Sequence, residues 1–158
     1  MDPGLKSLYA NLSQRLAADA DLARLNLSAK ARPSVRLSAH RAPSALIGIG
    51  ESRIGGAPDV PRGFEWPRWI PSKPRDDVYA KPWRPDGPAP LGFIAQIDLS
   101  DIPQVDDNLP NSGWLYFFYD RHCEPWGFDP TDRGSCRIIY VDPDRSELSR
   151  ADDLLLKS

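Results

Sequence analysis

The feature that most restricts the fold of this 158-residue chain is a dense run of prolines in its middle. Nine prolines fall within residues 58–90, together with Trp66, Trp69 and Trp83. Proline has no amide hydrogen to donate, so this stretch is excluded from a helix and from the interior of a sheet. Three tryptophans are costly to leave in water, which favours order. The pattern therefore predicts a long irregular loop anchored by aromatic side chains.

The segments on either side of this loop favour β structure, with a helix at the N-terminus. Residues 4–24 place apolar side chains at helical spacing, which predicts an amphipathic helix within a helical segment 1–28. Alternation after Pro33 predicts a strand over 35–39, and a short apolar segment, "SALIGIG", follows it. β-branched and aromatic residues predict three more strands, over 91–99, 113–120 and 136–142.

Composition points to one folded domain, 1–158, with 41% apolar and 27% charged residues. No apolar run reaches the ~18–20 residues that span a bilayer, and the N-terminus does not resemble a signal peptide. Two cysteines, Cys123 and Cys136, make no disulfide framework. These features predict a cytoplasmic protein with no membrane partner.

The net charge of −2 hides an asymmetry along the chain. Residues 24–75 hold ten basic and three acidic side chains, a net charge of +7, whereas residues 76–158 hold eight basic and sixteen acidic ones, a net charge of −8. The basic half is compatible with an acidic partner. The simpler interpretation is that the two halves face each other in one fold and neutralise each other's charge. The chain has no dense run of Lys and Arg, so nucleic-acid binding is not predicted.

The stretch "GIGESRIGGAPDVP", residues 48–61, raises the question of a phosphate-binding loop. A P-loop requires Lys and Ser/Thr after its second glycine, where this chain has Gly56 and Ala57. The dinucleotide-binding spacing also fails, and "APDVPRGFEWP" cannot begin the helix that both motifs need. The glycines therefore predict a backbone turn.

A second candidate segment, "PWGFDPTDRGSCRIIY", spans residues 125–140. Its polar cluster of Asp129, Asp132 and Arg133 is interpreted first as a turn in which Asp side chains accept backbone amides, and alternatively as a ligand site. Cysteine and histidine spacing does not predict a metal site, and no combination of nucleophile and base predicts catalysis. We expect no catalytic residue, metal or cofactor.

Four ordered segments together resemble the YwqG-like family of bacterial domains of unknown function. They are "ESRIGGAPDVPRGFEWP", "PLGFIAQIDLSDIP", "LPNSGWLYFFYD" and the segment at 125–140. The resemblance implies an intracellular, mainly antiparallel β domain, with no established catalytic residues. The expected fold class is thus α+β: mainly antiparallel β sheet over 33–142, with an N-terminal amphipathic helix and the long Pro/Trp-rich loop. Family members are longer, so the domain is expected to be incomplete at its C-terminus.

Our leading hypothesis is a non-catalytic binding module with a protein partner, by analogy of a toxin-neutralising type. The alternative is a small-molecule enzyme or sensor with a pocket between the glycine turn and "PWGFDPTDRG". The candidate binding residues for either function are Arg53, Gly55, Gly56, Gln96, Trp126, Asp129, Asp132 and Arg133. Self-association through an unpaired edge of "CRIIYVD" or "GWLYFFYD" is also expected.

Overall fold

The computed structural model describes residues 34–70, 88–104, 108–121 and 124–151, together with Ser7, Ala10, Asn11, Gln14 and Arg15. The chain divides into two compact units, Met1–Val35 and Arg36–Ser158. All of the strands described below belong to the second unit.

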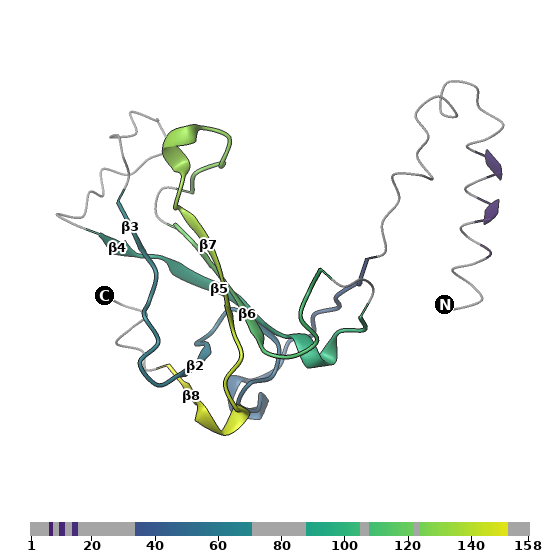
Figure 1. The fold of residues 1–158 in the computed structure, drawn as a ribbon, viewed down its shortest axis with the longest axis horizontal. Helices are drawn as coiled ribbons and strands as arrows, with labels where there is room; N and C mark the ends of the chain where they lie inside the picture. The colour runs from purple at the N-terminus through teal and green to yellow at the C-terminus, as the bar shows by residue number, and fades with distance from the viewer. Residues whose placement is uncertain are drawn as a thin grey trace. The chain divides into compact units, whose positions relative to one another are not determined.

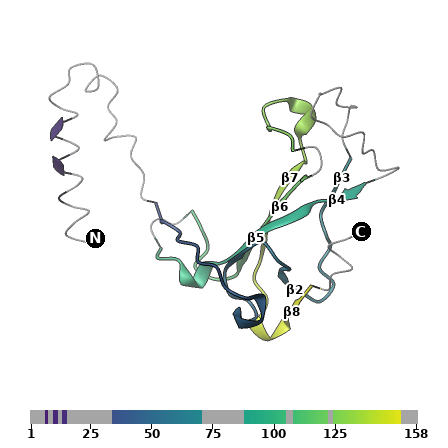
Figure 2. The ribbon, with the colours of Figure 1, turned by 180° about the vertical axis from the view of Figure 1, so that it is seen from behind.

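A four-stranded antiparallel sheet is the centre of the second unit (Figure 1). Its strands are arranged in the order β1 (Arg53–Ile54), β5 (Gly92–Asp98), β6 (Trp114–Tyr119) and β7 (Cys136–Val141). Strands β5, β6 and β7 lie side by side from either viewpoint (Figures 1 and 2). One register line runs through Gln96, Tyr116 and Ile139, and a bulge at Ile94 interrupts the pairing of β5 with β6.

Two short ribbons flank this sheet. β2 (Asp59–Pro61) pairs with β8 (Leu148–Arg150), and β3 (Arg68–Trp69) pairs with β4 (Ala89–Pro90). Both ribbons include proline, which explains their length, because each proline removes one donor from the ladder. The prolines thus limit each strand of these ribbons to two or three residues.

Single turns of 3-10 helix connect several strands. They are η1 (Ser44–Leu46), η2 (Leu99–Asp101), η3 (Pro130–Asp132) and η4 (Arg145–Glu147). Asp98 and Asp129 cap η2 and η3 by accepting a backbone amide two residues later. The residue that ends each turn is not helical, so none of them extends into an α-helix.

The hydrophobic core lies on one face of the sheet. Successive side chains of a strand point to opposite faces, so Trp114, Tyr116 and Phe118 of β6 share this inner face, and all three are buried. Phe64 and Trp66 pack against Phe118 from the proline-rich segment, with ring centroids 6.1 Å and 5.0 Å away. The other buried core residues are Val60, Leu91, Phe93, Leu148 and Ala151.

The predicted α+β fold class is wrong. The described residues from 34 onward form antiparallel β sheets joined by 3-10 turns, and no α-helix of seven or more residues is found among the described residues. The residues at the C-terminal ends of these turns are not helical, so helix growth stops after one turn. The N-terminal helix predicted over 4–24 lies largely outside the described residues.

The strand predictions had mixed outcomes. Those over 91–99, 113–120 and 136–142 are confirmed as β5, β6 and β7. The strand predicted over 35–39 is wrong in the part that the structure describes, because the chain there pairs with no strand. Most of its side chains are exposed, so alternation alone did not indicate a buried face. The predicted irregular loop contains the short strands β2, β3 and β4, and residues 71–87 lie outside the described residues.

Candidate functional site

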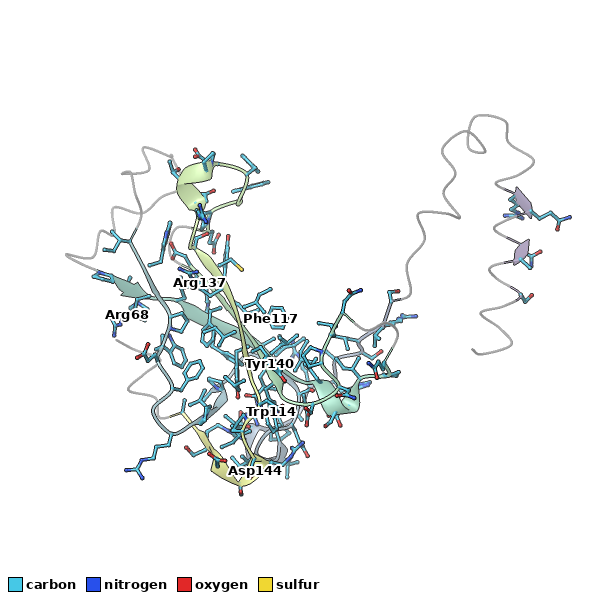
Figure 3. The ribbon with its side chains drawn as sticks, viewed as in Figure 1. Arg68, Trp114, Phe117, Arg137, Tyr140 and Asp144 are labelled. Atoms are coloured by element: carbon cyan, nitrogen blue, oxygen red, sulfur yellow. The ribbon has the colours of Figure 1, made fainter. Side chains whose placement is uncertain are left out.

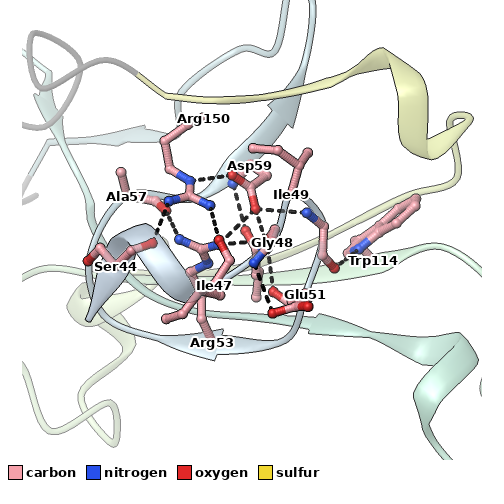
Figure 4. Close-up of polar contacts among 12 residues, drawn as sticks. Ser44, Ile47, Gly48, Ile49, Glu51, Arg53, Ala57, Asp59, Trp114 and Arg150 are labelled. Carbon is pink, nitrogen blue, oxygen red and sulfur yellow. Dashed lines mark hydrogen bonds and ion pairs between the residues drawn. The ribbon is translucent and has the colours of Figure 1, made fainter. Parts of the chain in front are cut away.

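A buried carboxylate, Asp59 of β2, is the centre of a polar cluster beneath the sheet (Figure 4). Its Oδ2 accepts hydrogen bonds from Gly50 N at 2.8 Å, Arg53 Nη2 at 3.0 Å and Gln96 Nε2 at 3.1 Å. Its Oδ1 accepts one from Arg150 Nε at 2.5 Å. Two arginines therefore pair with one carboxylate that has no contact with water.

Arg53 is the buried arginine of this pair, with its side chain 3% exposed. Besides Asp59, its guanidinium donates to Ala57 O at 3.2 Å and to Gly48 O at 3.1 Å. Burial lowers the pKa of Arg53 from its usual value, and the Asp59 charge opposes that shift. Its Nε has no hydrogen-bond partner in the described structure. The Arg53 side chain thus contacts backbone carbonyls both before and after itself in sequence, at Gly48 and Ala57.

Gln96 of β5 connects the cluster to the central sheet. Its carboxamide oxygen accepts from Asp59 N at 2.7 Å, and its nitrogen donates to Glu51 O at 2.8 Å as well as to the Asp59 carboxylate. On the neighbouring strand, the Tyr116 hydroxyl donates to Asp59 O at 2.5 Å. Burial, and next the Asp59 charge, raise the pKa of Tyr116.

Side chains from distant parts of the chain donate hydrogen bonds to the carbonyl groups of the loop over residues 44–50. Arg150 donates to Ser44 O and Ile47 O, and Arg145 donates to Ile49 O. Trp114 Nε1 donates to Gly50 O at 2.8 Å. The arginines and the indole thus come from β6 and from the C-terminal strand region, 64 to 106 residues away in sequence. The loop takes its shape from these distant donors.

A second ion pair closes the edge of this cluster. Asp98, which is buried, accepts from Arg145 Nη2 through one carboxylate oxygen and from Ser100 N and Oγ through the other. The Arg145 guanidinium also lies 5.4 Å from the centroid of the Trp114 ring, within range of a cation–π interaction. Arg145 therefore links the loop, the sheet and η4.

This geometry explains the glycine-rich stretch. The backbone of Gly50 is left-handed, with φ +80°, and a Cβ there would lie 2.8 Å from Arg145 Nη1. The amide that a bound anion would use at Gly50 already donates to Asp59. Gly55 and Gly56 also have positive φ, in open space. The predicted turn is confirmed, and the chain's own Asp59 carboxylate accepts the amide hydrogen of Gly50.

The second candidate segment forms an aromatic turn, residues 124–134, between β6 and β7. Trp126 and Phe128 are each 82% exposed, and their rings meet edge to face at 6.2 Å. Asp132 Oδ2 accepts from Gly127 N at 3.0 Å, and Asp129 Oδ1 accepts from Thr131 N at 2.8 Å. The polar residues fold the turn, and the two rings point outward from it.

Anchors at the base of the aromatic turn fix it to the sheet. The Tyr119 hydroxyl donates to Pro125 O at 2.6 Å, and Trp69 Nε1 donates to Arg133 O at 3.1 Å. Between the two strands, Asp120 N donates to Ser135 O at 2.8 Å. A turn held in this way loses little conformational freedom when it binds a partner.

The structure divides the predicted site residues into two groups. Arg53 and Gln96 lie together in the Asp59 cluster, with Gly55 and Gly56 in the adjoining turn. The other four lie in the aromatic turn: Trp126, Asp129, Asp132 and Arg133. This turn lies beyond one end of β6 and β7, whereas β2 and β8 lie toward the other end (Figures 1 and 2). The structure therefore does not bring the glycine turn and the "PWGFDPTDRG" segment together.

Sequence reasoning missed the residues at the centre of the cluster. Asp59, Arg145 and Arg150 were not singled out, and Arg53 was predicted only as a candidate binding residue. Its partner is Asp59, six residues away. An acid among the prolines of an otherwise apolar strand was the available signal, because such a carboxylate needs buried donors.

Residues 52–156 match a protein family described as a domain of unknown function (DUF1963). The chain belongs to this family. The matched region of the DUF1963 domain includes the side chains that meet at Asp59 and the whole aromatic turn. No curated protein matches the chain.

Two further findings on this DUF1963 domain concern metal-binding groups and membrane-spanning helices. Within 34–70, 88–104, 108–121 and 124–151, no group of three or more His, Cys, Asp or Glu side chains is placed to hold a metal ion. In the part of the chain that the structure describes, no helix has the length and apolar character needed to cross a bilayer.

Proposed function

We propose that this chain is a non-catalytic, protein-binding module of the YwqG-like type within the DUF1963 family, and that it acts in the cytoplasm of a bacterium. The observation that carries the proposal is the aromatic turn, which presents Trp126 and Phe128 to solvent at 82% exposure each. The YwqG-like assignment and the bacterial origin rest on the four sequence segments that resemble that family.

Two exposed aromatic rings in contact are a typical anchor for a protein partner. Trp is enriched among the few interface residues that contribute most of the binding energy, and such residues insert into apolar pockets. With roughly 150–250 Å² for each ring, the pair presents about 300 Å² of surface. A patch of this size commonly marks an interaction site on a soluble protein.

The rigidity of the turn supports the same function. Asp129 and Asp132 hold the backbone on either side of Phe128, and Trp69 and Tyr119 hold the ends of the turn. Because these contacts fix the loop in advance, less entropy is lost on binding. The partner that fits is a protein with an apolar pocket for the two rings.

The polar cluster has a structural role in this proposal. The Asp59 carboxylate and the guanidinium groups of Arg53 and Arg150 contact one another or the carbonyls of the loop over 44–50. The buried charged groups therefore stabilise the fold. The small-molecule alternative required the glycine turn and the aromatic turn to share a pocket, and they lie at different ends of the sheet.

The test compares capture of proteins from a bacterial lysate by the wild-type chain and by the double variant Trp126→Ala, Phe128→Ala. We expect at least one protein to be captured by the wild type alone, and to bind roughly 30-fold more weakly to the variant once purified, since loss of a central aromatic costs about 2 kcal/mol or more. The matched control is Leu46→Ala, which removes an apolar side chain that is 75% exposed on η1. Equal capture by the wild type and the double variant would overturn the proposal.

A further inference from the structure

The face of the central sheet opposite the core is also apolar. The register places Ile54, Ala95, Phe117 and Ile138 in one line across β1, β5, β6 and β7. A second line, one step along the strands, is formed by Ile97, Leu115 and Tyr140. Phe117 and Tyr140 are labelled among the side chains of the sheet in Figure 3. We call these seven residues the outer face.

Most of the outer face is exposed or half-buried. Ile54 is 73% exposed, Ile138 60% and Tyr140 43%, and Ile94 in the adjacent bulge is 37% exposed. An antiparallel sheet with one solvated face normally alternates between apolar residues inside and polar residues outside. No member of the outer face carries a charge. The pattern is that of a sheet face that packs against another surface.

The exposed area is large enough for a weak interface. With roughly 150–200 Å² for a fully exposed side chain of this size, the three most exposed residues and Ile94 present about 350 Å². The half-buried neighbours bring the total to roughly 500 Å² on one copy, so two copies bury about 1,000 Å² between them. That area is at the lower limit for a specific complex.

We propose that the outer face is the interface of a homodimer, in which the sheets of two copies pack face to face. Two sheets with the same twist stack at about 10 Å with their strands within roughly 30° of each other, so a second copy has the shape that covers this face. Because the seven side chains of the outer face are uncharged, those of two identical copies meet without repulsion between like charges. The dimer is independent of the aromatic turn and leaves it available to a different partner.

The geometry distinguishes this dimer from one formed by strand pairing. Among the described strands, β7 and β1 form the two edges of the sheet. The open edge predicted at "GWLYFFYD" is therefore wrong, because β6 pairs with β5 on one side and with β7 on the other. An edge-paired dimer through β7 would cover Ile138 and leave Ile54, at the opposite edge, in solvent. Face-to-face packing covers both residues. Substitutions at the two edges therefore report on the geometry.

The experiment is sedimentation of the full chain over a series of concentrations, with the variants Ile54→Lys, Ile138→Lys and Leu46→Lys. We expect the wild type to dimerise with a dissociation constant on the order of 10 µM. Each of the two outer-face variants should weaken the dimer at least tenfold, since each buries a charge. The control Leu46→Lys, at an equally exposed apolar residue on η1, should not change it. Circular dichroism checks that every variant is folded.

Other outcomes contradict the proposal. A dimer that Ile138→Lys disrupts and Ile54→Lys leaves intact is edge-paired through β7. A wild-type chain that stays monomeric at 100 µM and above assigns the face to a different partner or to a segment of the same chain. Alkylation of Cys136, read from its peptide mass, provides a second measurement, because its thiol lies on β7 at the border of this face. It should become slower as the protein concentration increases.

Discussion

Substitution of Asp59 by Asn tests the central claim about the polar cluster. Asparagine has almost the same shape, so the core stays filled, but it has no charge and presents an NH2 group in place of one oxygen. Whichever way the amide is turned, at least one of Arg53 and Arg150 then faces another donor. Arg53, with its side chain 3% exposed, also keeps its charge without a buried counter-charge.

The expected loss of stability follows from that burial. Breaking a buried ion pair by removing one partner typically costs about 3–5 kcal/mol. A domain of this kind has a free energy of unfolding of roughly 5–15 kcal/mol, so the variant should lose a large share of it. At about 2–4 °C per kcal/mol, the melting temperature should fall by roughly 10 °C.

Urea unfolding followed by circular dichroism measures this change. All variants are compared at one protein concentration, because dimerisation would otherwise contribute to the apparent stability. Asp101→Asn is the matched control, since Asp101 is exposed on η2, and it should change the free energy of unfolding by less than about 0.5 kcal/mol. The double variant Arg53→Gln, Asp59→Asn should show a coupling of about 1–3 kcal/mol between the two residues. If Asp59→Asn lies within 1 kcal/mol of the wild type, the cluster does not stabilise the fold as argued.

Two further predictions concern a buried tyrosine and a pair of glycines. The raised pKa of Tyr116 gives stability that is present below about pH 10 and lost as the pH rises toward the folded-state pKa; Tyr116→Phe should cost about 1–3 kcal/mol at pH 7 and flatten the decline in unfolding free energy above pH 10. An equally steep decline in the Phe variant would refute this assignment. Gly113 and Gly127 both have φ +83°, but a Cβ would lie 2.5 Å from Val141 O at Gly113 and meet nothing within 4 Å at Gly127. Gly127→Ala should therefore cost about 1–2 kcal/mol and Gly113→Ala at least twice as much in thermal or urea unfolding, and equal costs would contradict the close approach at Gly113.

Several elements of this protein could be predicted from local sequence. β5, β6 and β7 were found because β-branched and aromatic residues dominate them, and this preference depends only on the residues of each segment. The glycine turn was predicted for a similar reason, since positive φ is inexpensive for glycine alone. The aspartates of the aromatic turn also accept hydrogen bonds from amides only two to five residues away. Each of these features is determined by contacts close in the chain.

The partners of the buried charges were decided by the tertiary structure. The sequence marked Arg53 as noteworthy, but only the pairing of β2 with β8 brings Arg150 to Asp59 from 91 residues away. The strand order also places the glycine turn and the aromatic turn at different ends of the sheet, whereas the alternative prediction from sequence had placed them in one pocket. The sequence by itself determined the three long strands and the glycine turn, because propensity and backbone freedom are local. Only the tertiary structure decided which face of the sheet stays open and which charges meet, because both depend on strand order and register.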